Sequence, residues 1–528
     1  MKKCVLPGTF IPGPNKSKNV DSYLFPGLHH LAALQRESLQ IWDAHEDRVF
    51  TSRPYLALAT ADGPGMTYLN GLVGHQGAYG CRLYCPTKGR HKPNAPHYYP
   101  ALSRPIDYTV EGCDHDDIDP RHIPLTSTDE YTQNLAYVME SPNETQYKIR
   151  WRETGIAKPS IFSGLPSNRV LGIPGCFPAD LMHLVSLNLT DLFLSLWRGT
   201  LECEAPDSRE SWDWAVLQGE TWKSHGKRVA AAKPYLPGTF DRPPRNPAEK
   251  ISSGYKAWEY LTYVFALGPG VFLGVLPDKY WTHFCKLVAA VRLIHQRSIT
   301  SDQLRTAHTL IIEFVEEFEI LYYQRKVERL HFCRQSLHAL LHLAPEAVRV
   351  GPQAYYTQWT MERTIGNLGE EIKQPSKPFA NLSQRGCRRS QVNALKAIIP
   401  DLEPDSSVLP HNAIDLGGGF ILLRARDSCA REINGEAGEA IQKYFQTHAP
   451  DQFDANSWPR VIQWARLRLP NGQVVRSAWK EKSKPPLGVR MSRNVKVIVT
   501  FDLCMMTMAD ITSIVLFAAT RQTATEFC

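Results

Sequence analysis

Acidic side chains that could do chemistry stand at three separate places in the chain. They are Asp62, the Asp-x-x-His group of Asp180 and His183, and Glu362 beside Arg363. Carboxylate oxygens are the ligands that a hard cation such as Mg²⁺ prefers. Each place also has an ordinary interpretation, because a lone aspartate is commonly a turn or cap residue and an adjacent Glu-Arg pair is commonly an exposed ion pair.

Cysteines and histidines form a second group of candidate ligands. Those that lie closest together in the sequence are Cys81, Cys85, His91 and His97. Thiolate and imidazole suit Zn²⁺, but a C-x₃-C pair with loosely spaced histidines is a weaker signal than two C-x₂-C pairs, so zinc and plain structural roles both stay open. His338 and His342 share one face of a predicted helix. Without the glutamate of an H-E-x-x-H motif, we interpret them as structural.

The elements around the acids can be predicted from hydrophobic patterns. Pro54 to Thr60 is a short apolar run that stops at a Gly/Pro turn, which predicts a buried strand with Asp62 at its end. Leu181 to Trp197 predicts a strong amphipathic helix with Asp180 placed to cap its start.

The rest of the chain alternates between helical and irregular patterns. Apolar residues recur at roughly helical spacing from Val20 to Asp43. Residues 81–130 are irregular, and the acid-rich part from Glu111 to Glu130 resembles a surface linker. Tyr255 to Leu343 predicts three or four helices. Val461–Leu469 and Gln473–Trp479 flank a Pro-Asn-Gly turn and predict a β-hairpin.

Composition excludes several classes of protein. With 528 residues, 43% hydrophobic and 21% charged, the chain is expected to form two to four globular domains rather than a disordered one. No apolar stretch is long enough for a membrane span, and the N-terminal segment lacks the apolar region of a secretion signal, so we expect an intracellular, non-secreted protein with reduced cysteines. A net charge of +7 is too small to indicate nucleic-acid binding by itself.

In order and setting, the motifs resemble those of fungal CACTA (En/Spm-like) DNA transposases. The resemblance covers roughly residues 8 to 390. Trp359, Glu362, Arg363, Gly366 and Leu368 match the family's aromatic and E-R helix start. The other matching segments are Ile11–Asn15 with the leucine-rich helix after it, Ala61–Met66, Gly71–His75, Cys81–Pro86, Pro178–His183 and Phe240–Arg245.

The resemblance implies a DD(E)-class enzyme with an RNase H-like catalytic domain. By this resemblance Asp62 and Glu362 hold Mg²⁺ (or Mn²⁺), and Asp180 and His183 are catalytic-site residues that support them. It also implies cleavage and strand transfer at the ends of a DNA element. The implied partner is the DNA of terminal repeats, with homo-oligomers and a nuclear location, and with neither a membrane nor a small-molecule substrate.

The family's first catalytic aspartate lies on a strand upstream of the Pro-Gly-Pro segment, which here begins within a dozen residues of Met1. We therefore expect an N-terminally truncated remnant, such as a pseudogene product, that is inactive because this first Asp is missing. One alternative is a non-catalytic nuclear DNA- or protein-binding factor derived from a transposase. Another is an unrelated protein with a small zinc module.

The expected fold class is α/β, an incomplete RNase H-like domain interrupted by an all-α insertion. The expected parts are 1–200, a partial core; 201–345, a mainly helical insertion; 346–400, the end of the core with Glu362; 401–496, a small mixed or β domain; and 497–528, an atypical tail. Basic side chains that could contact phosphates, or simply form a solvated face, are Arg388, Arg389, Lys480, Lys482, Lys484, Arg490 and Arg493.

Overall fold

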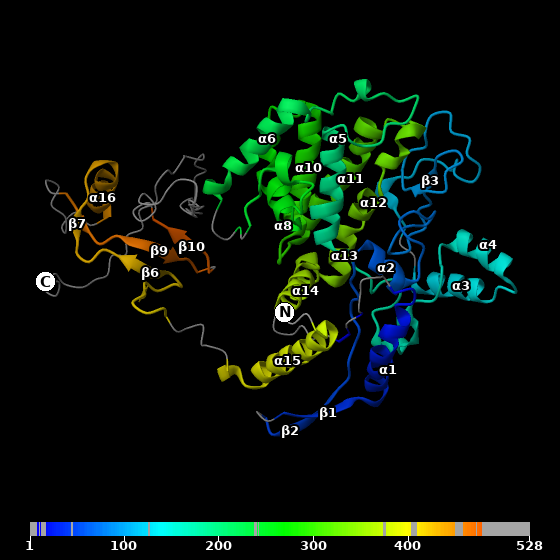
Figure 1. Cartoon of the computed structure of the whole chain (residues 1–528), viewed down its shortest axis with the longest axis horizontal. Helices are drawn as coiled ribbons and strands as arrows, with labels where there is room; N and C mark the ends of the chain where they lie inside the picture. The colour runs from blue at the N-terminus through cyan, green and yellow to red at the C-terminus, as the bar shows by residue number, and fades with distance from the viewer. Residues whose placement is uncertain are drawn as a thin grey trace. The chain divides into compact units, whose positions relative to one another are not determined.

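The chain divides into two units, whose elements are labelled in Figure 1. The first unit comprises Met1–His225 and Tyr255–Pro400, and the second comprises Gly226–Gly254 and Asp401–Cys528. The computed structural model describes residues 8–9, 11, 17–43, 46–124, 127–236, 240, 242–372, 376–402, 409–448, 458–470 and 472–477. The tail at 497–528, residues 12–15 and the lysines and arginines between 480 and 493 lie outside these ranges.

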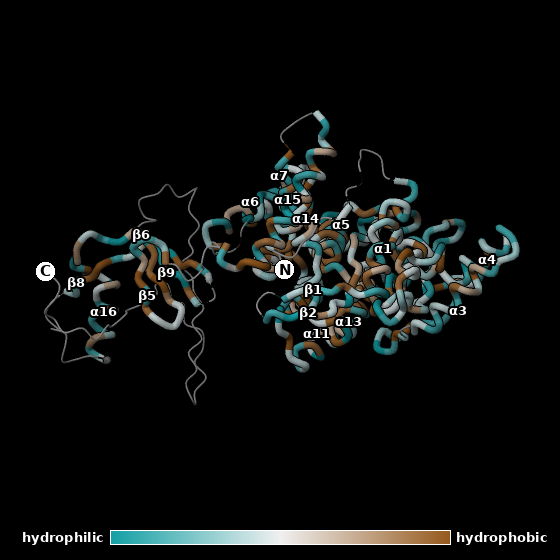
Figure 2. The backbone as a smooth tube through the Cα atoms, turned by 90° about the horizontal axis from the view of Figure 1, so that it is seen from below, coloured by the Kyte–Doolittle hydropathy of each residue, from teal (hydrophilic) through white to brown (hydrophobic). Residues whose placement is uncertain are grey.

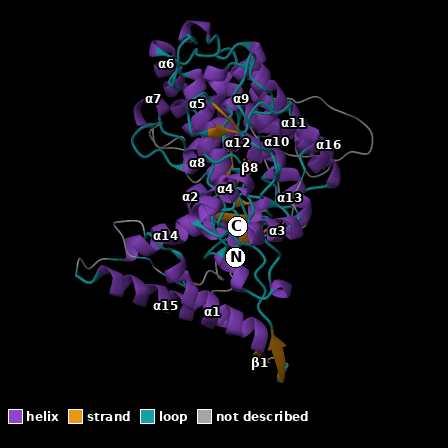
Figure 3. Ribbon diagram, turned by 90° about the vertical axis from the view of Figure 1, so that its right-hand side faces the viewer, coloured by secondary structure: helices purple, strands orange, loops and turns teal. Residues whose placement is uncertain are grey.

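Helices make up most of the structure, as the purple ribbons of Figure 3 show. Those that begin before residue 226 are α1 (Asp21–Glu37), α2 (Gly63–Asn70), α3 (Thr128–Met139), α4 (Glu144–Thr154), the π-helix η5 (Met182–Leu189), α5 (Thr190–Trp197) and α6 (Gly219–Ala231). Those from residue 247 onward are α7 (Pro247–Lys250), α8 (Ala257–Tyr260), η8 (Leu261–Leu267), α9 (Gly268–Phe272), α10 (Asp278–Ile294), α11 (Ser301–Phe318), η9 (Glu319–Tyr323), α12 (Gln335–Leu341), α13 (Leu343–Val350), α14 (Trp359–Glu371), α15 (Pro378–Ile398) and α16 (Gly435–His448).

The core of the first unit is helical and rich in aromatic side chains. The segment η5–α5 packs against α8 and α12, and its Trp197 ring meets Phe272 and Phe284 edge-on. Most side chains of η5–α5 are buried, and the exposed residues Asn188 and Asp191 lie three positions apart on one side, so the amphipathic helix predicted there is confirmed. Each large apolar side chain buried there contributes about 1.5–3 kcal/mol. Figure 2 marks hydrophobic stretches in brown along the helices of this unit.

The helical prediction for Tyr255 to Leu343 is confirmed, with one correction. Helices α10 and α11 form its longest part and pack together. The helix that begins at Ser301 does not run unbroken to Leu343, because Gln324 and Arg325 both adopt left-handed backbone angles, with φ of 56° and 54°. This turn redirects the chain into a short 3-10 helix and then α12.

The helix predicted from Val20 to Asp43 is wrong over its last five residues. Helix α1 ends at Glu37, and Ser38 has a φ of 69°, which stops the helix. Residues Leu39–Asp43 form β1, which pairs antiparallel with β2 (Arg48–Ser52). The apolar spacing of this part therefore reflects a hairpin whose Trp42 side chain is 62% exposed.

The strand predicted before Asp62 is extended but forms only a single isolated bridge. Leu56 pairs in parallel with Val170, and the Ala59 N–H donates to the Cys176 carbonyl at 2.8 Å. Between these two contacts the partner segment contains Pro174, which has no N–H to donate, so a regular ladder is interrupted. Burial reaches only Ala59, whereas Leu56 is half-buried.

The described residues are 52% helical and 9% strand, so the chain is a mixed α and β protein with small sheets. In the first unit the described sheets are two-stranded, β1 with β2 and β3 (Arg90–His91) with β4 (Tyr98–Tyr99). The central sheet expected of an RNase H-like domain is not among them. A helix-rich mixed fold is therefore what the structure establishes.

Residues 81–130 contain little regular structure, and a buried arginine holds them together. Arg90 is fully buried, and its guanidinium donates to five backbone carbonyl oxygens. These acceptors belong to Ala101, Leu102, Cys113, His115 and Asp116. A buried guanidinium has five N–H donors to satisfy, so this arrangement ties the start of the acid-rich stretch to β4.

The second unit contains a four-stranded antiparallel sheet in the order β10-β9-β6-β5. Its strands are β5 (Ile414–Asp415), β6 (Ile421–Arg426), β9 (Trp464–Arg468) and β10 (Val474–Arg476), and β7 (Arg431–Glu432) pairs with β8 (Arg460–Val461). The predicted hairpin is confirmed as β9–β10. Gly472, with a φ of 81°, closes its turn by donating to the Leu469 carbonyl.

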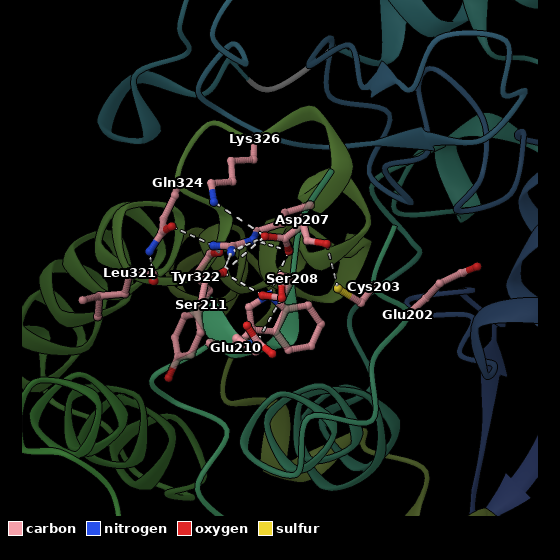
Figure 4. A network of polar contacts seen from close by, with 12 residues as sticks. Glu202, Cys203, Asp207, Ser208, Glu210, Ser211, Leu321, Tyr322, Gln324 and Lys326 are labelled. Carbon is pink, nitrogen blue, oxygen red and sulfur yellow. Dashed lines mark hydrogen bonds and ion pairs between the residues drawn. The ribbon is translucent and has the colours of Figure 1, made fainter. Parts of the chain in front are cut away.

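A buried ion pair joins two distant parts of the first unit (Figure 4). The Arg329 guanidinium donates to both carboxylate oxygens of Asp207, at 2.7 and 2.6 Å, and both side chains are 1% exposed. The Trp212 indole N–H also donates to Asp207 at 2.8 Å. Burial raises the pKa of Asp207, but the hydrogen bonds from Arg329 and Trp212 outweigh it and lower the pKa to about 2.

Replacing Arg329 by methionine should destabilise the protein strongly, because the Asp207 carboxylate would stay buried without its partner. We expect the free energy of unfolding to fall by about 3–5 kcal/mol, measured by urea denaturation with tryptophan fluorescence. The matched control is Arg305→Met, which removes an ion pair with Asp302 on an exposed face and should cost less than about 1 kcal/mol. Equal losses in the two variants would contradict the interpretation.

Candidate metal centre and acidic cavity

Four buried side chains from two distant segments meet in what we call the Cys2His2 cluster, formed by Cys81, Cys85, His338 and His342. All their ligand atoms lie within 4.8 Å of one another. The Cys81 Sγ lies 3.4 Å from His342 Nε2, the Cys85 Sγ lies 3.1 Å from His338 Nε2, and the two Nε2 atoms are 3.0 Å apart. The cluster could hold a metal ion such as Zn²⁺.

Local structure brings each pair of ligands to the same side. His338 and His342 lie four positions apart at the end of α12, so they occupy one helix face. Cys81 and Cys85 flank a turn in which the Tyr84 N–H donates to the Cys81 carbonyl, and Tyr84 has a left-handed φ of 56°. The turn returns the chain so that both thiols reach the cluster.

The two thiols have pKa values that shift in opposite directions. Burial raises the pKa of Cys81, but the hydrogen bond with Cys85 and the charges of His342 and His338 outweigh it and hold that pKa well below its usual value. The hydrogen bond with Cys81 and burial raise the pKa of Cys85 well above its usual value. Cys81 is therefore the thiol that loses its proton more easily, and the thiolate is the form that binds metals.

The structure brings Cys81 and Cys85 together with His338 and His342, and not with the two histidines that the sequence suggested. His91 and His97 do not belong to the cluster. The His91 Nδ1 contacts the Lys92 carbonyl at 2.8 Å, and the His97 ring stacks on Tyr99 with a centroid distance of 4.7 Å. The i,i+4 spacing of His338 and His342 was the sequence signal that could have grouped them as a candidate ligand pair.

A cavity of about 620 Å³ lies beside the cluster and is bordered by α2, the start of η5, α12 and the loop before β4. Asp62, Asp180 and His183 line it, together with His75, His97 and Arg82. The described residues therefore bring two of the three acidic groups and the histidine of the Asp-x-x-His group to a single cavity.

Asp180 is a buried carboxylate saturated with donors. Its Oδ1 accepts from Thr357 Oγ1 at 2.7 Å and from the Gln358 N–H at 2.8 Å, and also from Met182 N–H at 3.2 Å. Its Oδ2 accepts from the His183 N–H at 3.1 Å and pairs with His183 Nδ1. The bonds to Met182 and His183 confirm that Asp180 caps the start of this helix.

The ion pair shifts the titration of both partners. Burial raises the pKa of Asp180, but the hydrogen bonds from His183, Gln358 and Thr357 outweigh it and lower the pKa. The hydrogen bond to Asp180 raises the pKa of His183, and the charges of Asp180, Asp62 and Glu362 act in the same direction against burial. His183 is therefore more easily protonated than an ordinary histidine.

Asp62 and Glu362 are exposed carboxylates near the same histidine. The Asp62 Oδ1 accepts from the Gly65 N–H at 2.8 Å, so Asp62 is the N-cap of α2, which ends at Gly71 with a φ of 71°. A side chain at Gly71 would clash with the Lys158 carbonyl, 2.1 Å from an added Cβ, so glycine is needed there. Glu362 stands in the first turn of α14.

The turn before α14 connects all three acidic groups. Thr357 and Gln358 bind Asp180, and the Gln358 side-chain amide donates to Thr60 Oγ1 at 2.7 Å, two residues before Asp62. Gln358 also accepts the Glu362 N–H at 2.9 Å through its carbonyl. One short segment thereby fixes the mutual positions of carboxylates that are up to 300 positions apart in the sequence.

Of the predicted phosphate-binding side chains, Arg388 and Arg389 lie in the described α15. Arg389 forms an ion pair with Glu371 of α14, whereas Arg388 is exposed. The arginine pair therefore divides into one side chain that joins two helices and one that faces solvent.

Comparison with known proteins adds no relative. No model of a known protein family matches the chain, and a search of curated proteins finds no match either. None of the described helices is both long and apolar enough to cross a membrane. The function must therefore be argued from the cavity and the cluster themselves.

Replacing Asp180 by asparagine should lower the pKa of His183, because the variant removes both the acceptor charge and the ion pair. Histidine NMR titration would measure this, with His183→Gln to assign the signal. Asp302→Asn, on an exposed part of α11, is the control and should leave the titration unchanged.

The same ion pair makes stability depend on pH. A raised folded-state pKa means that His183 stabilises the fold fully below its unfolded pKa of about 6.5, and that this contribution is lost as pH rises through the folded pKa. The difference in the free energy of unfolding between the wild type and Asp180→Asn should therefore become smaller as pH rises from about 6.5 through the folded-state pKa of His183. A gap that widens with rising pH in urea denaturation would contradict the assignment.

Proposed function

We propose that the chain derives from a cut-and-paste DNA transposase of the CACTA type, and that its acid-lined cavity binds the phosphodiester backbone of DNA with the help of Mg²⁺. The observation that supports it best is that Asp62, Asp180 and His183 line one cavity, and that the charges of Asp62, Asp180 and Glu362 all raise the pKa of His183. These residues come from three separate segments.

The residues present fit a hard divalent cation only in part. Asp62 and Glu362 are exposed carboxylates, and Mn²⁺ or Mg²⁺ would be held by these two. Asp180 has both oxygens committed to protein donors, so it orients His183 rather than binding a metal. Two carboxylates are enough ligands for one metal ion that keeps several water ligands. They leave too few protein ligands for a second metal ion.

When bound, such an ion would supply charge stabilisation to a phosphate oxygen. The chain's own residues would contribute position and charge: Asp180 orients His183 and favours its protonated form, whereas Arg82 lines the same cavity with its charge paired to Glu346. Because two-metal cleavage clamps both the entering and the leaving oxygen, we expect this site to bind DNA and cleave it poorly or not at all.

The second candidate is a non-catalytic DNA- or protein-binding factor of the same origin. The saturation of Asp180 favours it, because freeing that carboxylate for metal binding would break several hydrogen bonds at about 1 kcal/mol or more each. In this case the cavity would keep its shape but would not cleave DNA.

The proposal can be tested by titrating the purified chain with Mn²⁺, followed by EPR, and then with a fluorescent DNA duplex. We expect Asp62→Asn and Glu362→Gln each to weaken Mn²⁺ binding at least about tenfold, and to abolish any increase in DNA affinity caused by the metal. DNA affinity should fall steeply with salt.

Asp302→Asn serves as the matched control, since it removes an exposed carboxylate that is far from His183 in the sequence. Mn²⁺ affinity that is equal in the wild type and both site variants would refute the metal-binding role. Supercoiled plasmid distinguishes the two candidates: nicking that disappears in Asp62→Asn would establish an active nuclease, and intact plasmid with retained DNA binding would favour the binding factor.

A further inference from the structure

We propose that the Cys2His2 cluster is a closed structural Zn²⁺ site, and that this centre holds Asp180 in place through the buried carboxylate of Glu346. The proposal does not depend on the DNA function proposed above. It assigns a role to a metal centre that lies beside the cavity but contributes no side chain to its acidic wall.

A cation explains the cluster better than a hydrogen-bonded core does. Two imidazole Nε2 atoms lie 3.0 Å apart, and at least one of them must present a lone pair to its neighbours. Two cysteine sulfurs occupy the same buried space, so four atoms that can donate a lone pair to a metal lie within 4.8 Å of one another.

The ligands and their spacing select zinc. Bond lengths of about 2.3 Å to sulfur and about 2.1 Å to nitrogen would place tetrahedral ligand atoms about 3.4–3.8 Å apart. The separations of 3.0, 3.1 and 3.4 Å lie at or somewhat below this range, and all four ligand atoms lie within 4.8 Å of one another. Four protein ligands, all buried, leave no open position for water, which is the arrangement of a structural rather than a hydrolytic zinc site.

The site joins parts of the chain that are far apart in sequence. The contacting pairs are separated by 253 and 261 positions. A metal bond across such a separation ties the irregular segment after α2 to α12, where no regular sheet or helix pair connects them. The free energy of binding the metal therefore contributes directly to folding of this region.

An ion pair beside the cluster carries this link to Asp180. Arg82, which lies between the two cysteines, donates to Glu346 Oε2 at 2.6 Å, and Glu346 stands four residues after His342. The Glu346 side chain is fully buried, and its Oε1 accepts the Ala179 N–H at 2.7 Å. The residue next to Asp180 is thus bonded to a carboxylate whose position follows from the metal ligands.

Glu346 also reaches the other segment that holds Asp180. The Tyr356 hydroxyl donates to Glu346 Oε1 at 3.2 Å, and the next two residues bind the Asp180 carboxylate. The segment that contains Asp180 and the segment that binds its carboxylate are therefore both hydrogen-bonded to Glu346. Glu346 is a positioning residue in this arrangement, since it acts only through Asp180.

The metal can be tested on the full chain by measuring zinc content after purification without chelators. We expect one Zn²⁺ per chain, and a loss of affinity greater than about 100-fold in Cys85→Ser and in His338→Gln, since losing an outer-shell partner alone costs about 10–100-fold. His283→Gln is the matched control, because His283 is equally buried on α10 but lies outside the cluster. It should retain the zinc.

Metal exchange gives a signature that a merely structural histidine pair would not produce. The chain reloaded with Co²⁺ should show the strong visible absorption of tetrahedral cobalt and a sulfur-to-cobalt charge-transfer band. Both should disappear in Cys85→Ser. If a ligand variant does not fold, the wild-type chain stripped with chelator and reloaded with Zn²⁺ provides the same comparison.

The link to Asp180 can be tested by hydrogen exchange. Stripping the zinc should speed exchange of the Ala179 and Met182 amides at least about tenfold, while peptides of α10 keep their protection. Glu346→Gln should reproduce this effect with zinc still bound, because its amide cannot pair with Arg82.

Three results would overturn the proposal. A purified chain with no tightly bound zinc would remove the metal site. Zinc that survives Cys85→Ser unchanged would place the metal elsewhere. Zinc that is bound as expected, with Ala179 exchange unaffected by chelator and by Glu346→Gln, would leave a metal site but refute the role of Glu346. None of these results bears on Mn²⁺ binding by Asp62 and Glu362, so the two proposals fail independently.

Discussion

The structure around the cavity depends on satisfying one buried negative charge, the carboxylate of Asp180. A charge removed from water must find donors, and Asp180 takes them from the start of its own helix and from Thr357 and Gln358. Because the same turn leads into α14 and binds Thr60, meeting this requirement also fixes where Glu362 and Asp62 lie. The positions of the exposed acids are thus a consequence of the buried one.

Short-range patterns in the sequence predicted the elements that local physics determines. The helix from 181 to 197, its cap at Asp180 and the β9–β10 hairpin all follow from spacing and turn chemistry within about twenty residues. The strand at 39–43 was missed because its leucine and tryptophan also suit a helix, and only the left-handed Ser38 decides between them. The strand predicted at Pro54–Thr60 does not form a regular ladder beyond the bridge of Leu56. The reason is non-local, because Pro174, which has no N–H to donate, lies in the partner segment.

Non-local partners account for what the sequence could not reveal about the site. Cys81 and Cys85 were candidate ligands in the sequence. The histidines that they contact lie more than 250 positions away, so no local spacing pattern around the cysteines points to them. His91 and His97 lie nearer in the sequence and have suitable ring nitrogens, but they are not part of the cluster. Likewise, the sequence singled out Asp180 and His183 as supporting residues but could not show that Thr357 and Gln358 saturate the Asp180 carboxylate with hydrogen bonds. The RNase H-like fold stays a prediction.

The wide turns of η5 have an evolutionary consequence. A π-helical turn contains one residue more than an α-helical turn, and such turns also occur at η8 and η9. Deleting one codon within 182–189 can convert a wide turn into an ordinary one while Trp197 keeps its packing. The same deletion within α5 would rotate all following side chains by about 100°. The end of this helix that carries His183 can therefore drift in length one residue at a time, whereas its aromatic end cannot.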